Sequence, residues 1–286
     1  MALSVLALST AVVTYGLATL QLSRASTAGH VLRHPRWWFG VALQGVGFVL
    51  TFLARHQLPL LLVQPILTTS LVVTTVVGAA QGLWRLSRTD VLRCLLVVAG
   101  VALLAVAARP GTAGPLGVRG AVALSTAELI ALVALLRPPS VLTARHRALW
   151  LGGCAGLAYG AVAVAGRALA ADPFTLVRTA IGSWAVLLLL AGSVVGEAAL
   201  TVSLRTGRVG GPVSAMYVVS TVGPSLFGLL WLGDQMAADG WPLALVGTTA
   251  ALVGSLGLTD HGYAVPPPGL EPAPDASPGA SATAAP

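Results

Sequence analysis

The feature that most constrains this chain is a series of apolar runs, each long enough to cross a bilayer as a helix. A spanning α-helix needs about 20 mainly apolar residues. Nine runs meet this requirement, at residues 2–22, 37–54, 58–82, 91–108, 118–136, 148–169, 180–204, 212–232 and 242–259. The runs are continuous rather than alternating, which favours helices over barrel strands. We therefore predict an all-α, polytopic membrane bundle of about nine helices, each satisfying its own backbone groups.

The composition supports a lipid environment. The chain is 56% hydrophobic and 9% charged, whereas soluble domains carry about 25% charged residues. All 16 basic residues are arginine, and they fall mostly between the apolar runs. A nucleic-acid-binding chain would cluster them on one face, so we expect no nucleic-acid partner.

The arginines also predict an orientation. Eleven of them lie in or beside the loops after the first, third, fifth and seventh runs, and we assign the other five to the opposite side: Arg55, Arg109, Arg119, Arg167 and Arg178. Because cytoplasmic loops are enriched in basic residues, we expect an external N-terminus, a cytoplasmic C-terminus and a location in the plasma membrane. The first run has no basic residue ahead of it, and it is as long as a membrane span. Both features argue against a cleaved signal peptide, so we expect this run to stay in the protein as a spanning helix.

The chain divides into one membrane domain, 1–259, and a tail, 260–286, that holds seven of the 18 prolines. Such a tail cannot bury a core, so we predict disorder there. Within the domain, residues 1–136 and 148–259 resemble each other. A shift of 147 residues aligns Trp37 with Trp184, Gly45 with Gly192, Pro65 with Pro212 and Trp84 with Trp231, and a slightly different shift aligns Tyr15-Gly16 with Tyr159-Gly160.

Five spans precede the second copy, which therefore enters the membrane from the other side. This predicts an inverted 5+4 repeat, an architecture common among transporters because the two halves can exchange conformations. A duplicated membrane protein that transports nothing is the alternative.

Three segments then resemble a known family. They are Arg36-Trp37-Trp38-Phe39-Gly40 with Gln44-Gly45-Val46-Gly47, Leu58-Pro59-Leu60-Leu61-Leu62-Val63-Gln64-Pro65, and Gly211-Pro212-Val213-Ser214-Ala215-Met216-Tyr217. They look like helices of the drug/metabolite transporter (DMT) superfamily, especially its EamA-like and NIPA-like branches. The resemblance implies nine helices in the NIPA-like branch and a pathway formed mainly by spans 1–4 and 6–9. It also implies magnesium transport for NIPA-like members and metabolite export for EamA-like ones. Many members carry Glu after the third and eighth spans, where this chain has Trp84-Arg85 and Asp234.

Two acids lie inside the apolar runs, Glu128 and Glu197. Intramembrane acids are costly and usually functional or paired, so each is a candidate proton carrier or cation ligand, with a structural acid as the alternative. Glu128 is the weaker candidate because its span has no counterpart in the second half.

Further polar residues are candidates for a solute pathway. Gln64 and Pro65 combine an amide with a helix interruption, and broken helices often mark transporter sites. Tyr159 and Tyr217 offer hydroxyls or stacking surfaces. For Gln44 we favour joining two helices, and for Tyr15 we favour packing.

Small residues predict close helix packing rather than chemistry. Glycines recur every fourth residue at Gly152, Gly156 and Gly160, and again at Gly192 and Gly196. We interpret Cys94 and Cys154 as small core residues, and the sequence suggests no particular metal site. No Walker A sequence, GxSxG elbow or redox dithiol is present, so we expect neither an enzyme nor a cofactor.

The sequence thus favours a secondary transporter that moves a small solute or metabolite. A magnesium or other divalent cation transporter is one alternative, and a membrane scaffold or accessory subunit is another. The expected partners are the lipid bilayer and a small solute or cation, and the question of a homodimer stays open.

Overall fold

A computed structural model describes residues 2–26, 31–109, 114, 116–170, 184–205 and 210–258. Within this part of the chain, nine helical segments are long and apolar enough to cross a membrane, which confirms the predicted polytopic bundle. Eight of the spans are α1 (Ala2–Ser26), α2 (Pro35–Arg55), α5 (Arg88–Ala107), α6 (Val118–Leu136), α7 (Ala144–Ala170), α9 (Trp184–Leu204), α10 (Gly210–Trp231) and α11 (Gly240–Gly257). The predicted tail, 260–286, lies outside the described residues.

The third span was predicted as one continuous helix, and the structure divides it into two. It consists of α3 (Leu60–Thr68) and α4 (Ser70–Ala80), which meet at Thr69. Pro65 lies inside α3 and has no N–H to continue the ladder of backbone hydrogen bonds. Thr69 then donates its hydroxyl to the Ile66 carbonyl over 2.6 Å, a local bond that competes with the helical pattern.

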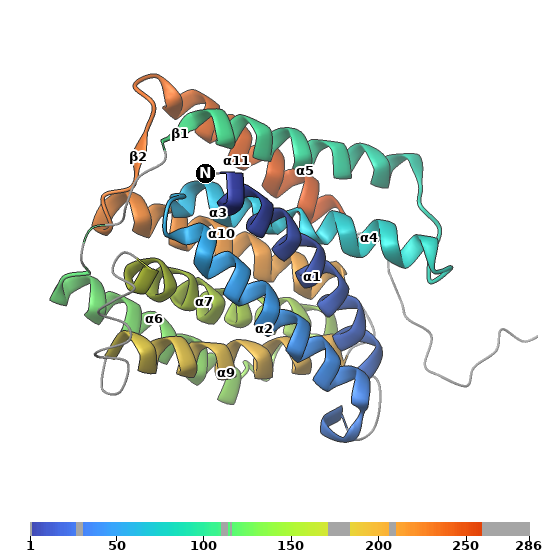
Figure 1. Ribbon diagram of the computed structural model, residues 1–286. Coiled ribbons are helices and arrows are strands. Elements are labelled where there is room, and N and C mark those ends of the chain that lie inside the picture. Colours follow the sequence, from blue (N-terminus) through green and yellow to red (C-terminus); the bar gives the residue numbers. More distant parts are fainter. Residues whose placement is uncertain are drawn as a thin grey trace, which may run out of the picture.

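The helices form a layered bundle (Figure 1). α5 and α11 pack along each other on one flank, and α6 packs on α7 and α9 on the opposite flank. Between these flanks, α1 packs on α2, α7 packs on α9 and α10, and α3 packs on α10. Two of these contacts, α3 with α10 and α5 with α11, join spans at matching positions of the two proposed halves. The inverted repeat stays a prediction, and these pairings are compatible with it.

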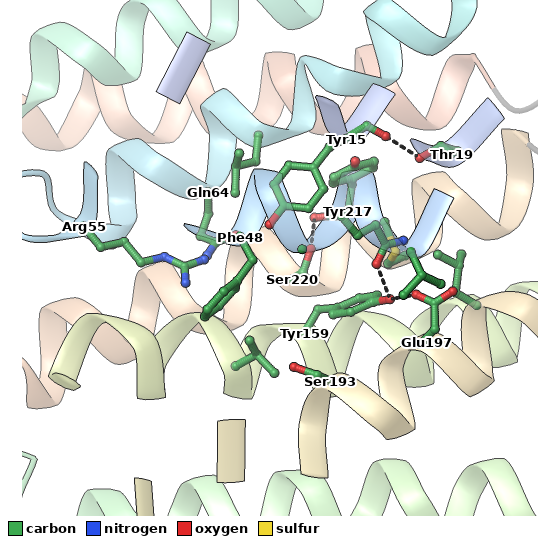
Figure 2. A pocket seen from close by; sticks show the side chains of 17 residues that line it. Tyr15, Thr19, Phe48, Arg55, Gln64, Tyr159, Ser193, Glu197, Tyr217 and Ser220 are labelled. Carbon is green, nitrogen blue, oxygen red and sulfur yellow. Dashed lines mark hydrogen bonds between the residues drawn. The ribbon is translucent and has the colours of Figure 1, made fainter. Parts of the chain in front are cut away.

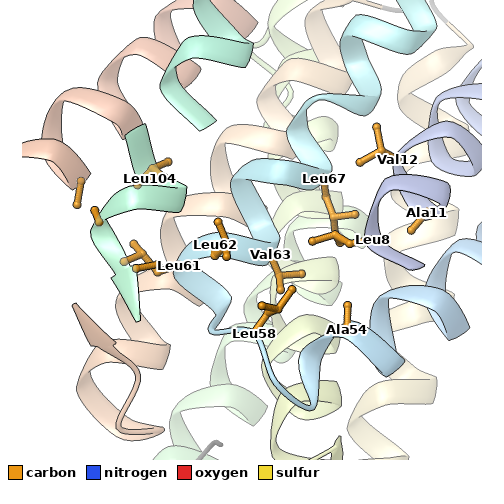
Figure 3. Packing of buried hydrophobic residues seen from close by; sticks show 13 residues of the cluster. Leu8, Ala11, Val12, Ala54, Leu58, Leu61, Leu62, Val63, Leu67 and Leu104 are labelled. Atoms are coloured by element: carbon orange, nitrogen blue, oxygen red, sulfur yellow. The ribbon is translucent and has the colours of Figure 1, made fainter. Parts of the chain in front are cut away.

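The α3 helix occupies the centre of the apolar core. Figure 3 shows Leu61, Val63 and Leu67 of this segment packed among side chains from α1, α2 and α5, including Leu8 and Leu104. A helix surrounded by others must be apolar on nearly every face. This explains the unbroken leucine-rich sequence at the start of the third span.

Two local features lie at the ends of α5. The helix begins at Arg88, three residues before the predicted start, because Ser87 and Asp90 form a capping box with bonds of 3.1 and 3.0 Å. At its other end, β1 (Ala108–Arg109) pairs antiparallel with β2 (Gln235–Met236). This short pair, which was not predicted, ties α5 to the loop after α10. A 3₁₀ turn, η1 (Val31–Arg33), precedes α2.

Candidate functional site

A cavity of about 280 Å³ lies at the centre of the bundle (Figure 2). Six helices line it, namely α1, α2 and α3 from the first half and α7, α9 and α10 from the second. The lining residues are Tyr15, Thr19, Val41, Gln44, Gly45, Phe48, Arg55, Gln64, Leu67, Tyr159, Val162, Ser193, Glu197, Leu200, Met216, Tyr217 and Ser220. The family resemblance also implied spans 4 and 9, but α5 and α11 contribute no lining residue.

Glu197 forms the acidic end of the cavity. Its Oε2 accepts a hydrogen bond of 2.9 Å from the Tyr159 hydroxyl, and the same hydroxyl lies 3.3 Å from Oε1 of Gln44. Thr201 approaches the other carboxylate oxygen at 3.4 Å and accepts a bond of 3.2 Å from the Trp37 indole. The carboxylate therefore belongs to a network that joins α2, α7 and α9. Gln44 connects two helices, as predicted for it, and also lines the cavity.

Two further tyrosines extend the polar lining. The Tyr217 hydroxyl of α10 is hydrogen-bonded to Ser70 of α4, and the side chain itself faces the cavity. Tyr15 packs against the apolar core, as the sequence favoured, and it also lines the cavity, which was not expected. The signal that could have identified it was its alignment with Tyr159 in the proposed repeat.

Arg55 and Gln64 form the opposite end of the cavity (Figure 2). The Arg55 side chain was assigned to a loop, but the structure places it inside the bundle, 3% exposed, with its guanidinium 5.8 Å from the Phe48 ring centre. Nε and Nη1 of Arg55 have no hydrogen-bond partner among the described residues, and neither does Nε2 of Gln64. This end of the cavity therefore presents unused donors.

Arg167 was likewise counted with the arginines of the external side, and the structure buries it inside the bundle, 1% exposed. Its Nη2 lies 2.9 Å from Oδ1 of Asp234, and its Nη1 donates to the carbonyl of Arg55. The second oxygen of Asp234 accepts a bond of 2.7 Å from the backbone N–H of Leu60. This buried ion pair joins the end of α7, the start of α3 and the loop after α10.

Glu128 and Pro65 lie outside the cavity lining. Glu128 of α6 is 7% exposed and sits behind the wall, against Gly192, with no partner for its Oε1 among the described residues. Pro65 is buried in α3 beside Gln64. The structure therefore brings together four of the six predicted pathway residues, Gln64, Tyr159, Glu197 and Tyr217.

The predicted packing glycines face neighbouring helices. On α7, Gly152 lies against the Pro212 carbonyl, Gly156 against the Met216 carbonyl and Gly160 against the Pro224 ring. On α9, Gly192 faces Val162 and Gly196 faces the Tyr159 ring. These small residues let α7 approach both α9 and α10 closely, as small residues do in membrane bundles.

The described part of the chain contains no group of three or more His, Cys, Asp or Glu side chains that could hold a metal ion. Among the described residues that line the cavity, Glu197 supplies the one carboxylate. Cys94 and Cys154 are free and buried in helices, as expected of small core residues.

Comparisons with known proteins agree with the architecture. The family model described as "Magnesium transporter NIPA" matches residues 4–133. An uncharacterized protein of Corynebacterium glutamicum is 27% identical over 228 residues, which cover 78% of each chain. No solved structure matches. Over residues 4–133 the chain therefore matches the NIPA-like branch of the drug/metabolite transporter superfamily, and this match together with the nine apolar spans of the described residues supports a membrane transporter.

Proposed function

We propose that this protein is a secondary transporter of the plasma membrane that carries a small polar organic solute through the central cavity. A proton or solute gradient drives it, and the chain performs no covalent chemistry. The N-terminus is external and the C-terminus cytoplasmic, as the arginine distribution favours. The observation that carries the proposal is the partly buried carboxylate of Glu197 in a cavity lined by three helices from each half.

The arrangement suits alternating access. In transporters built from inverted repeats, the solute binds near the middle of the membrane, between the halves. Here the network at Glu197 reaches from α9 through Tyr159 of α7 to Gln44 of α2. A solute that replaces one of these bonds would therefore change the contact between the two halves. The cavity volume of about 280 Å³ is near the lower end for ligand sites, which favours a small solute.

Magnesium is the second candidate, because the matching family model carries that description. Mg²⁺ prefers oxygen ligands and usually binds through one or two carboxylates, so Glu197 with tyrosine and amide oxygens is a minimal set. Arg55 lines the same cavity, however, and a buried guanidinium repels a dication. This repulsion favours the organic solute. A central cavity that contains charged and hydrogen-bonding side chains also argues against a scaffold, whose role requires no such cavity.

Purified protein reconstituted in liposomes tests the proposal. Thermal unfolding is first recorded with amino acids, nucleosides, lipophilic cations and divalent cations, because a ligand at 100 times its Kd adds about 2.7 kcal/mol of stability. Uptake of the stabilising solutes is then measured. We expect uptake of one organic class, with a marked loss in Glu197→Gln and retention in Glu128→Gln, a matched change behind the cavity wall. Uptake of Mg²⁺ alone would favour the second candidate, and no uptake of any solute would favour the scaffold.

A further inference from the structure

Arg55 is a buried cation that forms no ion pair with an acidic side chain among the described residues. Its side chain lines the cavity and is 3% exposed. Its Nε and Nη1 atoms have no hydrogen-bond partner in the described part of the chain. A buried charge without a partner is strongly unfavourable, so such a group usually has an occupant that supplies the missing acceptors.

The neighbouring acid is already engaged. Asp234 binds Arg167 at 2.9 Å through one oxygen and the Leu60 N–H at 2.7 Å through the other. Arg167 also donates to the backbone carbonyl of Arg55. Arg55 and Arg167 therefore lie close together. Among the described residues, the carboxylate found next to them is that of Asp234, and it pairs with Arg167. Arg55 is left to face the cavity.

Gln64 adds a second donor at the same end. It is 4% exposed, and its Nε2 has no partner among the described residues. Figure 2 shows the side chains of Gln64 and Arg55 together at one end of the cavity, with Glu197 at the other. A guanidinium fork and an amide N–H₂ match a carboxylate, which accepts several hydrogen bonds through two oxygens.

We infer that Arg55 and Gln64 bind the carboxylate of the transported solute, while Glu197 receives a cationic amino group at the other end of the cavity. The solute is therefore amphoteric, as an amino acid is. This inference rests on the proposed function, since it names the solute class for the same cavity. Arg55 and Glu197 carry opposite charges, so an amphoteric solute pairs both and leaves the occupied cavity electrically balanced.

The test follows the thermal unfolding of the full chain in detergent with matched probes. Each standard amino acid is compared with its amino alcohol, in which a hydroxymethyl group replaces the carboxylate. We expect at least one amino acid to bind on the order of tenfold more tightly than its amino alcohol. In Arg55→Gln this preference disappears, whereas Arg109→Gln, which removes an exposed arginine of β1, retains it. The inference is overturned if no amino acid binds more tightly than its amino alcohol, or if the preference survives in Arg55→Gln.

A second variant keeps the test independent of how well Arg55→Gln folds. Gln64→Glu places a carboxylate at the Arg55 end and so supplies internally the group that the solute would bring. We expect a higher unfolding temperature without solute and a loss of the response to amino acids. A Gln64→Glu protein that binds amino acids as tightly as the wild type contradicts the inference.

Two further arms identify the source of the anionic group and separate the two proposals. Stabilisation by sodium chloride or sodium phosphate equal to that by the best amino acid assigns the Arg55 end to an inorganic ion and refutes the amphoteric solute. In liposomes, uptake of a solute without an anionic group, at a rate unchanged in Arg55→Gln, refutes the carboxylate site and leaves the transport proposal intact. Liposomes that take up no solute refute the transport proposal itself.

Discussion

The hydroxyl of Tyr159 donates a 2.9 Å hydrogen bond to Oε2 of Glu197. The ring can reach this position because Gly196 precedes the acid on α9, and a Cβ at Gly196 would lie 2.9 Å from Cε1 of the ring. The bond therefore depends on three residues: an acid inside a span, a glycine beside it in the sequence, and a tyrosine on the facing helix. Together they hold a carboxylate in a fixed orientation at one end of the cavity.

The first prediction concerns this bond. Tyr159→Phe removes the hydroxyl and leaves Glu197 with the weaker contact to Thr201, at 3.4 Å. Hydrogen bonds to charged groups contribute about 1.5–3 kcal/mol, so we expect solute affinity to fall by at least about tenfold. Uptake by liposomes at several solute concentrations measures the change. In Tyr159→Phe/Glu197→Gln, the loss should be smaller than the sum of the two single losses, and additive losses would show that the two side chains act separately.

The second prediction concerns the space beside the ring. Gly196→Ala puts a methyl group 2.9 Å from the Tyr159 ring, so the ring must shift away from Glu197. We expect reduced uptake with little loss of stability, because alanine favours the helix by about 1 kcal/mol relative to glycine. Gly153→Ala is the control, since a Cβ there meets no atom within 4 Å. Equal uptake by the two variants would argue against a role for the ring position.

The third prediction concerns the buried ion pair. Asp234→Asn keeps the shape of the side chain but removes the charge that Arg167 pairs with at 2.9 Å. Breaking a buried pair typically costs about 3–5 kcal/mol, so we expect a clear fall in the unfolding temperature. Asp239→Asn, in the same loop, changes an exposed acid whose side chain makes no capping bond to α11, and it should unfold like the wild type. Similar unfolding temperatures for both variants would contradict a stabilising role for the pair.

Much of this molecule is predictable from the sequence because the bilayer imposes a length on every span. The apolar runs identify the nine helices, and the rule that intramembrane acids are costly identifies Glu197. The extra turn of α5 also has a local signal, since Ser87-Arg88-Thr89-Asp90 has the spacing of a capping box. These features depend on residues close together in the chain, which a reading of the sequence can relate to one another.

The cationic end of the site depends instead on distant contacts. An arginine at or near the end of a run resembles a flanking charge, so both Arg55 and Arg167 were counted with the arginines of the external side. Arg167 is buried because Asp234, 67 residues away, returns to it through the loop after α10. The sequence around Arg167 gives no sign of this contact with Asp234. Arg55 is buried because the end of α2 packs beside α7, close to Gly166.

The last prediction tests the contact between the two halves. Thr68 of α3 and Thr221 of α10 share a buried hydrogen bond of 3.0 Å between their hydroxyls, although neither lines the cavity. Such bonds in membrane proteins average about 0.6 kcal/mol, and a hydroxyl left unpaired costs about 1–3 kcal/mol. We therefore expect Thr68→Val or Thr221→Val alone to lower the unfolding temperature, and Thr68→Val/Thr221→Val to recover part of the loss.

Transport should respond differently from stability. Because α3 and α10 occupy matching positions in the proposed repeat, their contact must change when the cavity opens to either side. The double variant, with no hydroxyl left unpaired, should retain solute affinity but show an altered uptake rate. Uptake and thermal binding measured on the same preparation separate the two effects. If uptake rate and affinity both match the wild type, the contact between α3 and α10 is a static one, and the halves move about some other interface.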